Sequence, residues 1–162
     1  MSGGNAPTLS VRAEGLRVSI VASLWHSTIM DSLVTQAVRT CEEAGAVVDL
    51  VRVPGAFELP LACQRAARLN HAEAIVALGV VIRGGTPHFD YVCQGVTEGL
   101  MRVGLDESIP IGFGLLTVDN ESQAYDRAGF DNSTEDKGRE AAEAALVMAS
   151  MNRTTGGAVG FR

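Results

Sequence analysis

Residues 73–92, EAIVALGVVIRGGTPHFDYV, decide how the rest of the chain is interpreted. Residues 73–82 form a continuous apolar run rich in β-branched side chains, which predicts a strand buried on both faces. Two glycines and a proline interrupt the run, and a helix is predicted from Pro87 to about Gly104. A buried strand that leads through a short turn into a helix is typical of parallel α/β sheets.

The flanking sequence repeats this alternation of strand and helix. Ser27 is expected to cap the first helix and Gly45 to end it. A capping box of Asn120 and Gln123 is expected to open a short helix that stops near Gly129. The remaining strands are expected at 16–23, 47–53 and 109–118, and the remaining helices at about 28–44, 58–70 and 134–151. Because each crossover returns over the sheet, the pattern predicts an α/β fold with four parallel strands and helices on both faces.

Composition limits the classes of function. The 162 residues, 46% of them hydrophobic, suffice for one domain, and we expect a flexible arm at 1–15, a folded domain at 16–151 and a disordered tail at 152–162. The net charge of −6 without a basic block argues against nucleic acid as a partner, and no apolar run is long enough to span a membrane. The start of the chain has no signal-peptide pattern and the three cysteines form no CxxC pair, so a reduced, cytoplasmic protein is expected.

The turn RGGTPH (83–88) is the first candidate site, since ligands of open α/β sheets bind at the carboxyl ends of the strands. Thr86 is expected as the N-cap and Pro87 as the first helical residue. Gly84 and Gly85 allow a ligand to approach the backbone, and a helix N-terminus attracts anions, phosphate above all. The alternative is a tight turn that binds nothing.

His88 lies in the first turn of the same helix. The helix dipole favours the neutral imidazole, which can accept a proton and later return it. The alternative is a surface histidine without a role, and the residues alone do not decide between the two.

Other candidates belong to the remaining strands and the residues that follow them. Trp25 is either a core residue or a stacking surface for a flat ligand. Phe57 either packs or stacks, and Glu58 either caps the following helix or accepts hydrogen bonds from ligand hydroxyls. Phe113 lies inside a strand and is expected in the core.

Arg127 and Lys137 flank a polar loop, and each is expected to be a solvated charge. One of them near Gly85 would complete a phosphate site. Several catalytic and nucleotide-binding motifs are missing: there is no GxGxxG after the first strand, no GxxxxGK[ST], no HExxH and no GxSxG.

Four segments in this order resemble the 6,7-dimethyl-8-ribityllumazine synthase family: VPGAFELP (53–60), ALGVVIRGGTPHFDYV (77–92), FGLLT (113–117) and DRAG (126–129) with EDKG (135–138). The likeness covers residues 16–148. It implies a flavodoxin-like three-layer α/β/α fold. It also implies the condensation of 5-amino-6-(D-ribitylamino)uracil with 3,4-dihydroxy-2-butanone 4-phosphate, the penultimate step of riboflavin biosynthesis, with no metal and no organic cofactor.

The resemblance also implies a role for each matching residue. His88 corresponds to the family's proton-transfer histidine. The positions expected to hold the butanone phosphate are Gly85, Thr86, Arg127 and, by its KG dipeptide, Lys137. The positions expected to hold the ribitylaminouracil are Trp25, Ala56, Phe57, Glu58, Val80, Val81, Ile82 and Phe113, of which Phe113, like Arg127, comes from a neighbouring subunit.

Assembly and partners are implied in the same way. The family forms homopentamers, sometimes joined into sixty-subunit shells, with active sites between subunits. The loop FDNSTED (130–136) is longer and more polar than the glycine-rich linker of many shells, which favours a free pentamer. The N-terminal arm is expected to add to a neighbouring subunit, and a riboflavin synthase is a further partner that the resemblance allows. The alternatives are a relative that holds lumazine or flavin, or builds a shell, without turnover, and an enzyme that binds flavin mononucleotide.

Overall fold

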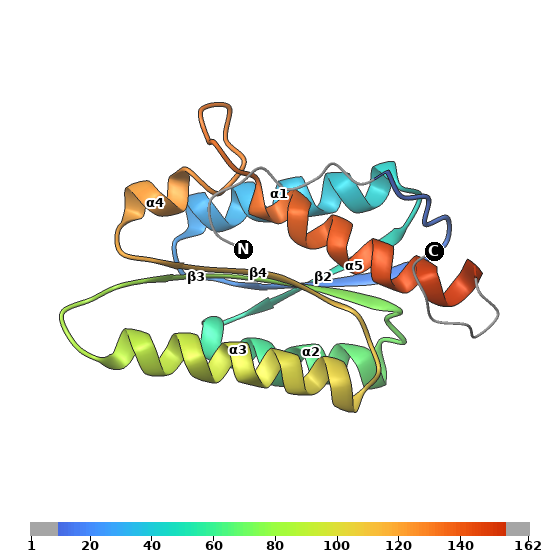
Figure 1. Ribbon diagram of the computed structural model, residues 1–162, viewed down its shortest axis with the longest axis horizontal. Coiled ribbons are helices and arrows are strands. Elements are labelled where there is room, and N and C mark those ends of the chain that lie inside the picture. The colour runs from blue at the N-terminus through green and yellow to red at the C-terminus, as the bar shows by residue number, and fades with distance from the viewer. Residues whose placement is uncertain (1–9, 155–162) are drawn as a thin grey trace.

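Four parallel strands form a single sheet in the order β2-β1-β3-β4 (Figure 1). The computed structural model describes residues 10–154. The strands are β1 (Arg17–Ser23), β2 (Val47–Val53), β3 (Ala74–Ile82) and β4 (Ile111–Val118). The four predicted strands are therefore confirmed, and the most apolar of them, β3, lies inside the sheet between β1 and β4.

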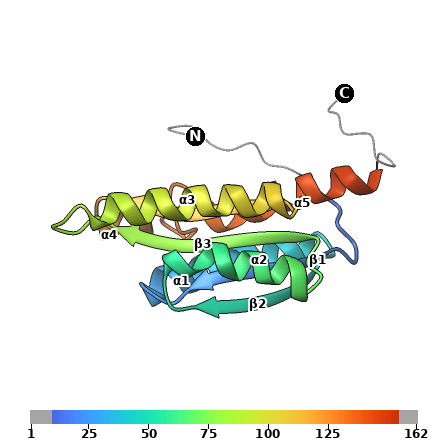
Figure 2. The ribbon, with the colours of Figure 1, turned by 90° about the horizontal axis from the view of Figure 1, so that it is seen from below.

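Helices cover both faces of the sheet and complete the predicted three layers. Helices α1, α4 and α5 lie on one face, and α2 and α3 lie on the other (Figures 1 and 2). The helices are α1 (Ser27–Glu43), a 3₁₀ turn η1 (Ala56–Glu58), α2 (Leu59–Leu69), α3 (His88–Asp106), α4 (Glu121–Tyr125) and α5 (Lys137–Thr154). The expected N-terminal arm falls mostly on residues 1–9, which lie outside the described part of the chain.

The side chains of β3 alternate between two hydrophobic cores. Val76 and Leu78 pack with α1 and α5, whereas Ile75 and Ala77 pack with α2 and α3. This explains why β3 has no polar position: each successive side chain points into one of two apolar layers. Burial also raises the pKa of the Cys63 thiol to about 12, which makes it unreactive at neutral pH.

The carboxyl ends of all four strands lie along one edge of the sheet. Ser23 pairs with Val53, and Ile82 pairs with Val118. The segments 24–26, 54–58, 83–87 and 119–120 therefore follow the strands at this carboxyl edge, which is on the left in Figure 1. This is where the sequence places the candidate site.

Two expected helix caps are wrong. Ser27 is already helical, and His26 precedes α1 in the left-handed conformation with φ 58°. Thr86 does not cap α3, because Pro87 occupies the N-cap position with φ −63° and its carbonyl accepts a hydrogen bond from Asp90 N at 3.0 Å. The fixed φ of proline already suits a helical turn, so the chain turns one residue later than expected.

Other helix ends follow the sequence more closely. Asn120 Oδ1 accepts a hydrogen bond from Gln123 N at 3.0 Å, so the expected cap of α4 is confirmed. Gly45 ends α1 with φ 87°. Helix α5 begins at Lys137, later than expected, because Asp136 Oδ1 accepts a hydrogen bond from Arg139 N at 2.9 Å and acts as its cap.

Candidate active site

The turn between β3 and α3 is anchored by the arginine that begins it. Arg83 Nε donates to Asp119 Oδ1 at 2.9 Å, and Arg83 Nη1 donates to Asp90 Oδ1 at 3.2 Å. The guanidinium also lies 4.1 Å from the ring centroid of Phe89. Arg83 thus joins the end of β4 to the first turn of α3 and fixes both ends of the turn.

The glycines of this turn have no structural need to be glycine. A Cβ placed on Gly84 or Gly85 would meet no atom within 4 Å, and neither residue has a left-handed backbone. Thr86 and His88 are exposed beside them, with His88 as the first residue of α3. The turn therefore presents an open stretch of backbone at the start of a long helix, next to an accessible imidazole.

Trp25 and Glu58 both lie close to Gly55. A Cβ on Gly55 would lie 3.1 Å from Glu58 Oε2 and 3.8 Å from Trp25 Nε1. Trp25 is 68% exposed, so in this chain it is not a core residue. Glu58 occupies the N-cap position of α2 without a side-chain cap hydrogen bond, so the capping role weighed for it is wrong. The pair places an aromatic surface beside an exposed carboxylate.

Ala56 and Phe57 flank the same place in different ways. Ala56 is buried, and its Cβ would lie 3.6 Å from a Cβ on Gly79 of β3. Phe57 is 67% exposed, and its ring edge approaches Gly95 of α3. Ala56 therefore fastens η1 to the sheet, while Phe57 leaves most of its ring accessible.

The end of β3 offers backbone rather than side chains. The ladder between β1 and β3 ends at the pair of Ala22 and Leu78, whereas the ladder between β3 and β4 continues to Ile82. Along Val80–Ile82, the backbone groups that point away from β4 therefore have no neighbouring strand and border the carboxyl edge of the sheet. Their side chains pack into the two cores.

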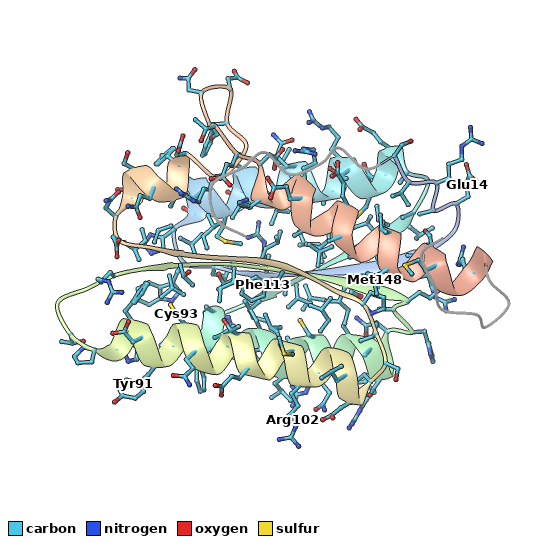
Figure 3. The ribbon with its side chains drawn as sticks, viewed as in Figure 1. Glu14, Tyr91, Cys93, Arg102, Phe113 and Met148 are labelled. Carbon is cyan, nitrogen blue, oxygen red and sulfur yellow. The ribbon has the colours of Figure 1, made fainter. Side chains whose placement is uncertain are left out.

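Phe113 lies away from this edge, and its expected place in the core is wrong. It is the third residue of β4, five residues and roughly 16 Å before the strand ends at Val118. It is 45% exposed and lines an apolar groove of about 600 Å³ along the outer edge of β4, together with Met101, Leu105 and Met148. Figure 3 shows Phe113 and Met148 on the elements that border this groove.

Arg127 and Lys137 form a cluster of ion pairs with two carboxylates. Both approach the carboxylate of Glu135: Arg127 Nε lies 3.5 Å from Oε1, and Lys137 Nζ lies 2.5 Å from Oε2. Glu140 Oε2 accepts from Lys137 Nζ at 2.7 Å, and Gln123 O accepts from Arg127 Nη1 at 3.0 Å. The expectation of two solvated charges is wrong, because both side chains are only partly exposed and are paired with carboxylates.

The two carboxylates of this cluster were missed in the sequence. Burial lowers the pKa of Lys137, but the hydrogen bonds to Glu135 and Glu140 outweigh this effect and raise the pKa above its usual value. The available signal was the segment EDKGRE (135–140), which places acidic residues two before and three after the lysine.

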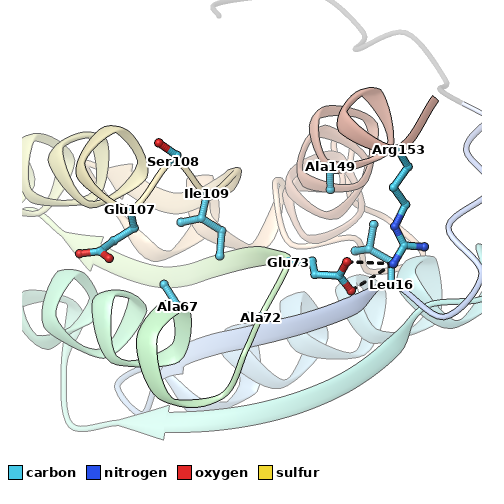
Figure 4. Close-up of a pocket in the computed structure, with 9 residues that line it drawn as sticks. All are labelled: Leu16, Ala67, Ala72, Glu73, Glu107, Ser108, Ile109, Ala149 and Arg153. Atoms are coloured by element: carbon cyan, nitrogen blue, oxygen red, sulfur yellow. Dashed lines mark hydrogen bonds and ion pairs between the residues drawn. The ribbon is translucent and has the colours of Figure 1, made fainter. Parts of the chain in front are cut away.

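A polar pocket lies at the opposite end of the sheet, where the strands begin (Figure 4). Its volume is about 290 Å³, and on one side of it Arg153 Nη2 donates to Glu73 Oε1 at 2.9 Å. None of the candidate residues lines this pocket. Within residues 10–154 there is no cluster of three His, Cys, Asp or Glu side chains suited to a metal, and none of the described helices is long and apolar enough to cross a membrane.

Comparison with known proteins agrees with the motifs. The family model of 6,7-dimethyl-8-ribityllumazine synthase matches residues 15–153. A 6,7-dimethyl-8-ribityllumazine synthase of Streptomyces coelicolor is 56% identical over 158 residues, covering 95% of this chain and 96% of that protein. One of Kineococcus radiotolerans is 58% identical over 147 residues, covering 90% of this chain and 91% of that protein. The chain therefore belongs to the 6,7-dimethyl-8-ribityllumazine synthase family.

Proposed function

We propose that this protein is a transferase that condenses 5-amino-6-(D-ribitylamino)uracil with 3,4-dihydroxy-2-butanone 4-phosphate to 6,7-dimethyl-8-ribityllumazine, with release of phosphate and water. The observation that carries this proposal is the arrangement at the carboxyl edge. Trp25, Glu58 and the turn before His88 follow three adjacent strands there, and the backbone of Val80–Ile82 ends one of those strands. The reaction is the penultimate step of riboflavin biosynthesis.

The aromatic half of the edge suits the ribitylaminouracil. Trp25 offers a flat surface on which the pyrimidine stacks, and the open backbone of Val80–Ile82 supplies donors and acceptors for its edge. Glu58 accepts hydrogen bonds from ribityl hydroxyls, and Ala56 and Phe57 border the same place.

The glycine turn suits the butanone phosphate. Gly85 and Thr86 precede a helix of 19 residues, so backbone N–H groups and the positive end of its dipole face a phosphate bound there. The absence of any packing or backbone need for glycine at position 85 supports a ligand that approaches the main chain closely.

His88 has the right place for the proton steps. The 5-amino group of the uracil attacks the ketone and a first water leaves. Phosphate is then eliminated, and the ribityl-bearing nitrogen attacks the remaining carbonyl and closes the ring with loss of a second water. Each step moves protons, and an imidazole beside the phosphate site can accept and return them. Holding the two reactants together supplies a further part of the acceleration.

We propose that a neighbouring copy completes each site. Phe113 is too far from the carboxyl edge of its own chain to close it, and it lies in an exposed apolar groove with Met101, Leu105 and Met148. Such a groove favours association between copies, which would bring the partner's Phe113, Arg127 and Lys137 to the edge. A free pentamer is the favoured assembly, with the polar loop 130–136 as its support, and riboflavin synthase is a further partner.

The cytoplasm is the proposed location. Cys41, Cys63 and Cys93 are all free thiols in the structure, as expected of a reduced compartment.

The direct test mixes the purified protein with both substrates and follows the fluorescence of the lumazine. Arg127→Ala serves as the comparison, because it removes the proposed phosphate partner. Enzyme-dependent product that is weakened in the variant supports the proposal. A folded oligomer that binds the uracil but forms no product would identify a ligand-holding relative instead.

A further inference from the structure

Glu135 occupies the position between the two proposed phosphate cations. Its two carboxylate oxygens point to different partners, Oε1 to Arg127 Nε and Oε2 to Lys137 Nζ. The same two cations are joined through their main chains, since Lys137 N donates to Arg127 O at 2.9 Å. The carboxylate of Glu135 therefore lies where an anion bound by both cations would place its oxygens.

With Glu135 in place, the cluster has no net charge to attract an anion. Arg127 and Lys137 supply two positive charges, and Glu135 and Glu140 supply two negative charges within ion-pair distance. A phosphate that approaches this neutral cluster gains no net Coulomb attraction until one carboxylate moves away.

The main chain restricts which carboxylate movement is available. Glu135 N donates to Asp126 O at 3.0 Å, and Glu135 O accepts from Gly129 N at 3.1 Å. The backbone of Glu135 is therefore fixed on both sides, and its carboxylate can leave only by rotation of the side chain, which is 27% exposed and has solvent on one side.

We propose that Glu135 is an affinity- and specificity-determining residue that holds the anion position between Arg127 and Lys137, so that a substrate phosphate binds there by displacing it. A phosphate dianion brings more charge and more oxygens than the carboxylate and replaces it, whereas a singly charged carboxylate ligand does not. Glu135 thereby keeps weaker anions out. This inference rests on the proposed role of Arg127 and Lys137 in phosphate binding.

The test compares the binding of inorganic phosphate and of acetate to the wild type, Glu135→Gln, Glu135→Asp and Asp131→Asn by titration calorimetry. Glu135→Gln removes the charge and keeps the shape, and we expect its Kd for phosphate to fall about tenfold and acetate to become a detectable ligand. Phosphate affinity should also depend more steeply on salt in this variant. Glu135→Asp keeps the charge in a shorter side chain, so its Kd for phosphate should lie closer to that of the wild type than to that of Glu135→Gln. Asp131→Asn makes the same charge change on the exposed part of the same loop and should change Kd less than twofold.

Unchanged or weaker phosphate binding by Glu135→Gln would overturn the inference, because Glu135 would then only support the two cations. Lumazine formation is measured on the same samples and reports on the proposed function separately. Product from the wild type, without tighter phosphate binding in Glu135→Gln, supports the function and contradicts this inference. Tighter phosphate binding in Glu135→Gln, without product from the wild type, supports the inference and contradicts the function.

Discussion

At the scale of single residues, the candidate site is made of side chains that this fold leaves accessible. Trp25 and Phe57 are large, apolar and about two-thirds exposed, which is unfavourable in water unless a ligand or a partner covers them. His88 is exposed at the start of α3. Sequence alone left each of these residues with two interpretations, and exposure decides against the core for both aromatic side chains.

His88→Ala should slow the condensation without abolishing it. A positioned proton-transfer group contributes on the order of 10²-fold, whereas the phosphate and pyrimidine sites continue to hold the reactants together. Single-turnover rates measure this loss. His71→Asn is a matched control at an exposed histidine that adopts φ 53°, a backbone conformation that asparagine also tolerates. Complete loss of activity in a folded His88→Ala protein that still binds both substrates would contradict the assignment.

At the scale of elements, strand and helix positions could be predicted because periodicity and local signals agree. The apolar run of β3 marks a strand buried on both faces, and Asn120 with Gln123 marks a real cap. The true N-caps of α1 and α3, His26 and Pro87, could not be predicted. Residue propensities favour Ser27 and Thr86 as caps and do not reveal the backbone conformation at the residue beside each of them. The environment of Lys137 could not be predicted either, because it depends on how the loop before α5 folds back onto Arg127.

Two glycine substitutions should separate function from folding. Gly85→Ala adds a methyl group in open space, so the free energy of unfolding should change by less than about 0.5 kcal/mol. The same methyl group would crowd the proposed phosphate, and the KM for the butanone phosphate should rise about tenfold, the loss expected for about 1.4 kcal/mol. Gly112→Ala should instead cost about 2 kcal/mol or more, because its Cβ collides with the backbone oxygen of Ala141 in α5. Denaturant unfolding and steady-state kinetics check both variants, and a large stability loss in Gly85→Ala would refute the argument.

Glu73 joins the end of α5 to the start of β3 and should make stability depend on pH. Its pKa is lowered by a backbone hydrogen bond from Arg17 and by the side chain of Arg153. Because the folded-state pKa is depressed, this contribution is complete above the unfolded-state pKa and is lost as pH falls through the folded-state value. Glu73→Gln should therefore lower the free energy of unfolding by about 1 kcal/mol at pH 7, a modest value because the pair is partly exposed. The difference between variant and wild type should shrink below about pH 4.5, and a difference that stays constant into acid would argue against this role.

At the scale of the whole molecule, the proposed site is incomplete within one chain. The carboxyl edge carries Trp25, Glu58 and His88, whereas Phe113 lies in the groove beside β4 and Arg127 in the cluster around Glu135. Sequence motifs name all five residues as candidates but give no information about which of them meet within one subunit. The register of β4 and the exposed groove are the observations that support the proposed second copy.

The most direct test of this account is complementation between two variants that each lack one residue of the proposed site. His88→Ala and Arg127→Ala are purified, unfolded together and reassembled, so that the oligomers contain both chains. If each site takes His88 from one subunit and Arg127 from its neighbour, random mixing leaves about a quarter of the sites intact. Lumazine formation should then rise to about a quarter of the wild-type rate, well above the sum of the separate variants. Mixed oligomers with no activity beyond that sum would show that the two residues do not meet across an interface, and the shared site would be wrong.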